Sequence, residues 1–318
     1  MNDLIQPPPQ ATMPSAARAL DARAVLTAWR AGKSPRTLQS YGWDLDDFAA
    51  FCGTGASEAA AQLLTLDAGR AHQLTLAYLE HMQQRGLSPA TCCRRIAALK
   101  SLAKAARLIG MLSWTLELPT PKAIPFKDTR GPGRAGFLRL VAEAEQQEEP
   151  LRARNLALLW LLYGRALRRS EAISLRYPED VDLGQGRILV LGKHRGEREW
   201  ATIPPASVRA LHAWIAQRGP RPGPLFHRLD RGQPRGGELQ PLSGLAVRDM
   251  IAGLGERTGQ RARPHGLRHA AITDVLDATR GDYRKAQRFG RLLSANVLRY
   301  YDDNRADEGG DAAKLIAP

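Results

Sequence analysis

The chain has 318 residues, of which 43% are hydrophobic and 25% charged, enough for two domains that each bury a core. Its 46 lysines and arginines exceed its 32 acidic residues, and the resulting net charge of +14 favours a polyanionic partner, nucleic acid above all. The longest apolar run, Leu156 to Gly164, is too short to cross a bilayer, and three cysteines without a CxxC pair favour reduced thiols in the cytosol over a disulfide framework.

The first predicted domain is a helical bundle over residues 16–115, after a tail at 1–15 that has neither the basic start nor the apolar block of a signal peptide. Ser34-Pro35 and Ser88-Pro89 each favour a helix start, with Ser as the N-cap and Pro in the first turn. Apolar residues spaced by three and four follow both starts. Weaker helices are expected at 22–29 and 71–84.

Positive charge continues through the end of this bundle and into a linker at 116–135. The last helix carries four basic residues that either contact phosphates or form a solvated face: Arg94, Arg95, Lys100 and Lys104. The linker is rich in proline and glycine, so it cannot be helical or lie inside a sheet. Its basic residues suit a strap that crosses a duplex backbone.

The second predicted domain, residues 136–318, mixes helices with a small β-hairpin. A helix at 136–146 precedes a buried apolar helix at 155–163, which ends in a turn bearing Arg168. Strands follow at 187–191 and 199–203, joined by a turn that carries Lys193. Taken singly, Arg168 is as well explained by a surface turn and Lys193 by a solvated hairpin tip. Further helices are expected at 207–218 and 243–258.

The last stretch, residues 264–305, contains the densest set of chemically active side chains. His265 and Arg268 lie three apart at a helix start and therefore point their donors to one side. Arginine offers a rigid fork for two phosphate oxygens, and histidine can give or take a proton near neutral pH. Tyr300 and Tyr301 follow some thirty residues later and offer a phenolic nucleophile. The alternative is a helix cap followed by tyrosines that only pack.

Together these signals resemble the tyrosine recombinase (phage integrase) family over nearly the whole chain. The segment Ala-Leu-Arg168-Arg-Ser-Glu-Ala is similar to the family's first arginine box, and Leu-Gly-Lys193-His-Arg-Gly to its hairpin lysine. His265-Gly-Leu-Arg268-His269 is similar to the second box. The resemblance implies an N-terminal DNA-binding bundle of the core-binding (SAM-like) kind and a mixed α+β catalytic domain. It also implies a site-specific DNA recombinase.

The implied chemistry starts from a phosphodiester whose charge repels nucleophiles. Arg168 and Arg268 are expected to bind its non-bridging oxygens, because preorganised positive charge is usually the largest catalytic contribution. Lys193 is expected to protonate the 5′ leaving oxygen, and His265 to handle the proton near the attacking oxygen. The product is a 3′-phosphotyrosyl enzyme with a free 5′-hydroxyl, which requires no cofactor, metal or small-molecule substrate.

One position departs from the family pattern, and it bears on the nucleophile. The family usually places a His or Trp nine residues before its tyrosine, whereas this chain offers Arg291 or Leu292. Arg291 would correspond to Tyr300 and Leu292 to Tyr301. In one subset of the family the tyrosine directly precedes Asp-Asp-Asn-Arg, the sequence that follows Tyr301 here, so Tyr301 is the predicted nucleophile.

The predicted partner is double-stranded DNA, bound by four copies of the chain in a synaptic complex in the cytoplasm, without any membrane. Two other functions remain open on the same fold. A type IB topoisomerase would relax supercoils as a monomer, and a non-catalytic DNA-binding protein would form no covalent adduct. The apolar tail at 312–317 is expected, by resemblance, to dock on a neighbouring subunit or else to fray.

Overall fold

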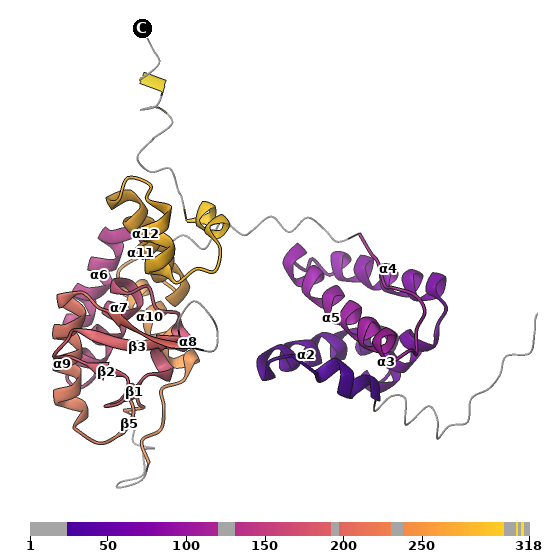
Figure 1. Ribbon diagram of the computed structural model, residues 1–318, viewed down its shortest axis with the longest axis horizontal. Coiled ribbons are helices and arrows are strands. Elements are labelled where there is room, and N and C mark those ends of the chain that lie inside the picture. The colour runs from indigo at the N-terminus through magenta and orange to yellow at the C-terminus, as the bar shows by residue number, and fades with distance from the viewer. Residues whose placement is uncertain are drawn as a thin grey trace, which may run out of the picture. The chain divides into compact units, whose positions relative to one another are not determined.

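The computed structural model describes residues 24–119, 131–191, 197–229, 238–301, 310 and 313–314. The chain divides into two compact units, one within residues 1–126 and one within 127–318 (Figure 1). Both units are built mainly of helices, and strands occur only in the second among the described residues. The predicted fold class, mainly α with a small β-hairpin, is confirmed.

The first unit is a helical bundle, and two of its helices begin at the Ser-Pro pairs that the sequence indicated. Its named helices are α2 (Pro35–Cys52), α3 (Ala56–Thr65), α4 (Ala68–Gln84) and α5 (Pro89–Leu108). The Ser34 hydroxyl accepts a hydrogen bond from the Thr37 N–H at 3.2 Å and caps α2. The Ser88 hydroxyl accepts one from the Thr91 N–H at 3.3 Å and caps α5. Each cap satisfies one N–H group that the first helical turn cannot pair internally.

Two carboxylates on α2, Asp44 buried and Asp47 half-buried, explain the arginines in the first half of α5. Asp44 is 1% exposed and accepts from Arg94 at 2.5 Å, while Asp47 accepts from Arg95, from Arg85 at 3.1 Å and from the Tyr78 hydroxyl at 2.7 Å. Arg94 and Arg95 therefore join α5 to α2. This role was not among the two that the sequence suggested for them.

The second unit combines helices with two small antiparallel sheets. Its elements are α6 (Gly133–Glu145), α7 (Leu151–Gly164), α8 (Arg169–Ser174), β1 (Arg176–Tyr177), β2 (Val181–Asp182), β3 (Arg187–Leu191), β4 (Arg198–Thr202), α9 (Pro205–Arg218), β5 (Gly223–Pro224), α10 (Gly244–Arg257), α11 (Pro264–Ala278), α12 (Tyr283–Gly290) and the 3-10 helix η2 (Ala295–Tyr300). One sheet has the strand order β2-β3-β4 and the other pairs β1 with β5. The predicted hairpin is thus β3 and β4, which pair Ile188 with Ala201.

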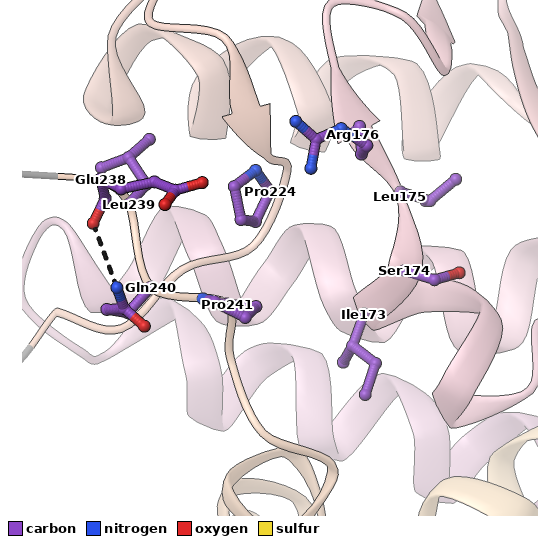
Figure 2. Close-up of a pocket in the computed structure, with 9 residues that line it drawn as sticks. All are labelled: Ile173, Ser174, Leu175, Arg176, Pro224, Glu238, Leu239, Gln240 and Pro241. Atoms are coloured by element: carbon purple, nitrogen blue, oxygen red, sulfur yellow. Dashed lines mark hydrogen bonds between the residues drawn. The ribbon is translucent and has the colours of Figure 1, made fainter. Parts of the chain in front are cut away.

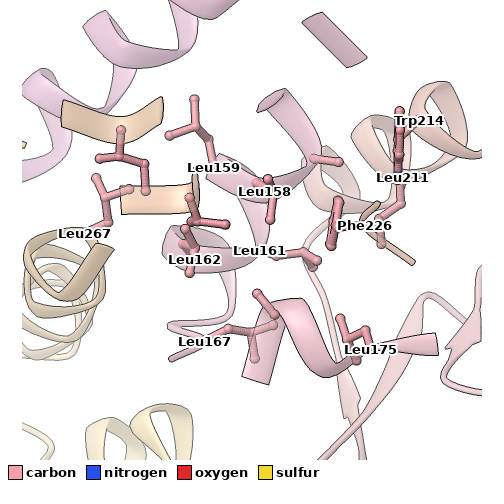
Figure 3. Close-up of a cluster of buried hydrophobic side chains, with 14 of the residues drawn as sticks. Leu158, Leu159, Leu161, Leu162, Leu167, Leu175, Leu211, Trp214, Phe226 and Leu267 are labelled. Atoms are coloured by element: carbon pink, nitrogen blue, oxygen red, sulfur yellow. The ribbon is translucent and has the colours of Figure 1, made fainter. Parts of the chain in front are cut away.

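Helix α7 forms the centre of this unit's core. Its leucines 158, 159, 161 and 162 are fully buried, and Trp214 and Phe226 pack in the same cluster (Figure 3). Burying one such side chain contributes about 1.5–3 kcal/mol. A helix that is apolar on every side must be surrounded by others, and α7 packs against α6, α8, α9 and α11. The chain immediately after α7 is consequently held in a fixed place.

A hollow of about 350 Å³ opens beside the C-terminal end of α8. Figure 2 shows it between the α8–β1 segment and residues 238–241, with Arg176, Pro224 and Glu238 among the residues that line it. Its described lining carries one cation, Arg176, and one acid, Glu238. Arg168 lies at the opposite end of α8, so this hollow is separate from the cluster of predicted catalytic residues.

Candidate active site

Four of the five predicted catalytic residues lie in the second unit at the ends of helices. Arg168 is the N-cap of α8, directly after the turn that follows α7. His265 and Arg268 lie in the first two turns of α11, and Tyr301 is the C-cap of η2. Lys193 lies outside the described residues, between the end of β3 and the start of β4.

The Arg268 side chain is buried, with 1% of its surface exposed. It donates hydrogen bonds to the carbonyl oxygens of Ala166, in the turn after α7, and Gly290, at the end of α12. Burial and the nearby charge of Arg168 lower its pKa to about 10, while the Tyr301 phenol opposes this shift. Arg268 therefore stays charged at neutral pH. Two of the five N–H groups of its guanidinium are used by these carbonyls.

The Arg168 side chain is oriented by Glu171, one helical turn further along α8. Arg168 Nη1 donates to Glu171 Oε1 at 2.7 Å, and the Arg168 backbone N–H donates to Glu171 Oε2 at 2.7 Å. The Arg168 side chain keeps 48% of its surface exposed, whereas that of Glu171 keeps 6%. Arg168 can therefore present the rest of its guanidinium to an incoming anion from a fixed position.

Glu171 is a site residue that the sequence analysis did not identify. An acid in the first turn of a helix, three residues after the N-cap, is the available signal for such a contact. Burial acts to raise the pKa of its carboxyl, but the charge of Arg291 and the hydrogen bonds from Arg168 outweigh this and hold the pKa below its usual value. Glu171 is thus a carboxylate at neutral pH.

His265 is exposed on the first turn of α11. The protein atoms that crowd its ring disfavour the charged imidazole, and Arg268, His269 and Arg168 add positive charge nearby, so its pKa is lowered. The ring is therefore neutral at pH 7 and can accept a proton.

Tyr301 is held against α11 through its backbone and its ring. The Thr273 hydroxyl donates to the Tyr301 carbonyl oxygen at 2.7 Å, and the Tyr301 N–H donates to Leu298 O at 2.7 Å. The ring lies on His269, with centroids 4.8 Å apart and planes at 31°. Tyr301 is 6% exposed. Thr273 and His269 received no role from the sequence, because only packing reveals their contacts with a residue about thirty positions away.

Leu292 and Arg291, the two candidates for the missing His or Trp, have different surroundings. Leu292 is 5% exposed and packs in an apolar cluster with Ile272, Leu298 and Tyr301. Arg291 turns its buried guanidinium toward Glu171, at 2.6 Å between Nη2 and Oε2. Leu292 therefore only packs. The side chain of Tyr300 and the predicted apolar tail, apart from residues 313–314, lie outside the described residues.

The described residues contain no group of three or more His, Cys, Asp or Glu side chains that could together hold a metal ion. In the same residues, no helix combines the length and the apolarity that crossing a bilayer requires. The described positive charges of the site belong to Arg168, Arg268 and Arg291. An arrangement of two or more guanidiniums, a neutral imidazole and a phenol can bind a phosphate diester and attack it.

Comparisons with known proteins agree with one another. The model of the phage integrase family matches residues 136–307. A tyrosine recombinase of Synechococcus elongatus is 36% identical over 90% of this chain and 90% of its own length. Another, from Synechocystis sp., is 32% identical over 90% of this chain and 91% of its own.

Solved structures show the same fold at lower identity. The Tn1549 transposon integrase, in complex with transposon right end DNA, matches with a TM-score of 0.64 and 15% identity, over 94% of this chain and 99% of that one. The XerH site-specific recombinase bound to palindromic difH substrate matches with a TM-score of 0.60 and 19% identity, over 79% of this chain and 73% of that one.

Proposed function

The chain belongs to the phage integrase family and is a tyrosine-type site-specific DNA recombinase, and from that premise we propose that Tyr301 attacks a DNA phosphate held by Arg168 and Arg268. The observation that supports the assignment is the packing of Tyr301 on α11, the helix that also carries His265 and Arg268. The Tyr301 ring lies 4.8 Å from the His269 ring, and the Thr273 hydroxyl donates to the Tyr301 carbonyl oxygen at 2.7 Å. The alternatives, a type IB topoisomerase and a non-catalytic binder, are not favoured by relatives that cover 90% of the chain.

The two arginines bind the non-bridging oxygens of the scissile phosphate. Arg168 offers an exposed guanidinium fixed by Glu171, and Arg268 offers the N–H groups that the Ala166 and Gly290 carbonyls leave unused. Both charges are in place before DNA arrives, so little reorganisation accompanies the charge that develops in the transition state. Removing one such donor typically slows a reaction by about 10²–10³-fold.

Two proton transfers accompany the exchange of oxygens at phosphorus. The Tyr301 hydroxyl loses its proton as it forms the new phosphorus–oxygen bond, and the neutral ring of His265 is suited to assist. The 5′ oxygen leaves and takes a proton, which we assign to Lys193. The result is a 3′-phosphotyrosyl bond and a free 5′-hydroxyl. A second 5′-hydroxyl then attacks this bond by the reverse path, so the energy of the phosphodiester is conserved.

Exchange of strands between two duplexes requires more than one active site. We propose that four copies of the chain assemble on two DNA duplexes and pass through a Holliday junction. The net charge of +14 supports tight contact with phosphates. The solved structures of the Tn1549 integrase and the XerH recombinase are complexes with transposon right end DNA and with difH substrate.

The test is a trapping experiment with a nicked duplex that carries the enzyme's own site, found by selecting bound fragments from the DNA beside its gene. Cleavage next to the nick releases a short strand and traps the covalent protein–DNA adduct. We expect Tyr300→Phe to form the adduct and Tyr301→Phe to form none, because neighbouring residues of a 3-10 helix project about 120° apart.

Each outcome of this experiment has one meaning. An adduct with Tyr301→Phe and none with Tyr300→Phe would transfer the role of nucleophile to Tyr300. An adduct in both variants would place the nucleophile outside this segment. Wild-type protein that binds the site without any adduct would be a non-catalytic binder, and relaxation of any supercoiled plasmid would indicate a topoisomerase.

A further inference from the structure

Arg291 has a conformation and an environment that disfavour an arginine. It is the C-cap of α12 with φ +50°, in the left-handed region where helices usually place glycine. Its side chain is 2% exposed, so its guanidinium group is almost completely desolvated. Its Nε has no hydrogen-bond acceptor among the described residues. Packing alone gives no reason for this residue at this place.

The other two nitrogens of Arg291 reach the groups that hold the predicted phosphate-binding arginines. Nη2 donates to Glu171 Oε2 at 2.6 Å, and the other oxygen of that carboxylate holds Arg168 at 2.7 Å. Nη2 also lies 3.4 Å from Ala166 O, the same oxygen that accepts from Arg268. Arg291 Nη1 donates to Arg165 O at 3.1 Å. Arg291 thus shares one acceptor with each phosphate-binding arginine.

Arg268 contacts the same end of α12 that carries Arg291. It donates to Gly290 O, the carbonyl immediately before Arg291, so the two residues fix the same helix end. Leu292, the next residue, fills the apolar cluster beside Tyr301 and offers no donor. The segment 290–292 therefore contributes a carbonyl, a buried cation and an apolar side chain, but no imidazole.

We propose that Arg291 is a positioning residue that holds Glu171 and the turn at Ala166 so that Arg168 and Arg268 converge on one phosphate. The proposal rests on the proposed function, since it concerns the alignment of groups for attack by Tyr301. Arg291 acts through Glu171 and Ala166 and does not itself contact DNA.

The acid–base behaviour of Glu171 gives the proposal a distinctive readout. Among the described residues, Arg168 and Arg291 contact its carboxylate, and the charges of Arg165 and Arg268 also act on it. After burial, which acts to raise the pKa of Glu171, the charge of Arg291 is the largest influence and lowers it. Loss of Arg291 should therefore raise this pKa. Protonation of Glu171 would then release Arg168 at a higher pH than in the wild-type enzyme.

The experiment compares Arg291→Gly with a control at a second left-handed arginine. Arg280 has φ +51° and is exposed, so Arg280→Gly relieves the same backbone strain without removing a buried contact. Cleavage of the nicked substrate is measured in single turnover at saturating protein, from pH 5.5 to 8.5. The dissociation constant for DNA and the melting temperature are measured for each variant.

We expect Arg291→Gly to slow cleavage by about 10- to 100-fold, the loss typical of residues that support a directly binding group. DNA binding should change less than threefold, and the acidic limb of the rate profile should move to higher pH. Arg280→Gly should match the wild type. Arg291→Lys keeps the charge, so it should keep the wild-type position of the acidic limb while recovering only part of the rate.

Equal cleavage rates and pH profiles for Arg291→Gly and Arg280→Gly would overturn the proposal. If Arg291→Gly fails to fold, Arg291→Lys decides: a shifted acidic limb in that folded variant would also overturn it. A wild-type enzyme that forms no adduct, or forms it without Tyr301, would overturn the proposed function first, and the wild-type reaction in the same series detects this.

Discussion

Thr273→Val should separate the alignment of Tyr301 from the rest of the site. Thr273 is fully buried, and its hydroxyl donates to the Tyr301 carbonyl oxygen at 2.7 Å. Valine has nearly the same shape but no donor, so the substitution leaves that carbonyl unpaired. An unpaired buried acceptor costs about 1–3 kcal/mol. For a unit of about 150–250 residues, each kcal/mol lowers the melting temperature by about 2–4 °C.

The same free energy sets the expected effect on cleavage. If the bond holds Tyr301 beside His269, its loss lowers the population of the aligned enzyme. A free energy of about 1–3 kcal/mol corresponds to a factor of about 5 to 150, which is the largest decrease in cleavage rate that we expect. The assay is single-turnover formation of the covalent adduct on the nicked substrate. DNA binding, measured in parallel, should not change, because Thr273 is buried.

Thr273→Ser is the matched control for this prediction. Serine keeps the hydroxyl and loses one methyl group, which costs about 0.8 kcal/mol of burial. It should therefore lower the melting temperature slightly while cleaving at close to the wild-type rate. A Thr273→Val enzyme that cleaves as fast as the wild type, or faster, would refute the reasoning, because the bond would then not be aligning the nucleophile.

Two further substitutions, the second with a control at Gly253, test other parts of the second unit. Lys193→Ala should leave DNA binding unchanged and slow cleavage by about 10²–10⁴-fold. A substrate with a 5′-bridging sulfur should recover most of the lost rate, because its thiolate leaves without a proton. If the rate does not recover, the general acid is another residue. Gly131→Ala should destabilise the unit by about 1–3 kcal/mol, because the added Cβ would lie 1.8 Å from Gly266 O on α11. Gly253→Ala, whose Cβ would meet only Arg257 Nη1 at 3.6 Å, should leave the melting temperature unchanged or raise it.

The sequence by itself determined several of the elements and the chemical class of the site. Helix starts such as Ser34-Pro35 and Ser88-Pro89 depend on residues three apart, and the observed caps use those residues. The hairpin β3–β4 follows from its alternation and turn residues. The spacing of His265 and Arg268 within one helix likewise placed both on α11. Such patterns are local, so the sequence contains them directly.

Only the tertiary structure decided which side chains meet across the unit. Glu171 and Arg291 are 120 positions apart, and their contact exists because the core around α7 brings the start of α8 against the end of α12. The same packing buries Leu292 and places Tyr301 on His269. No local pattern records such contacts, since they depend on how whole helices pack. The sequence offered Arg291 and Leu292 for one position and favoured Leu292 together with Tyr301, whereas the fold shows that the two side chains have different surroundings.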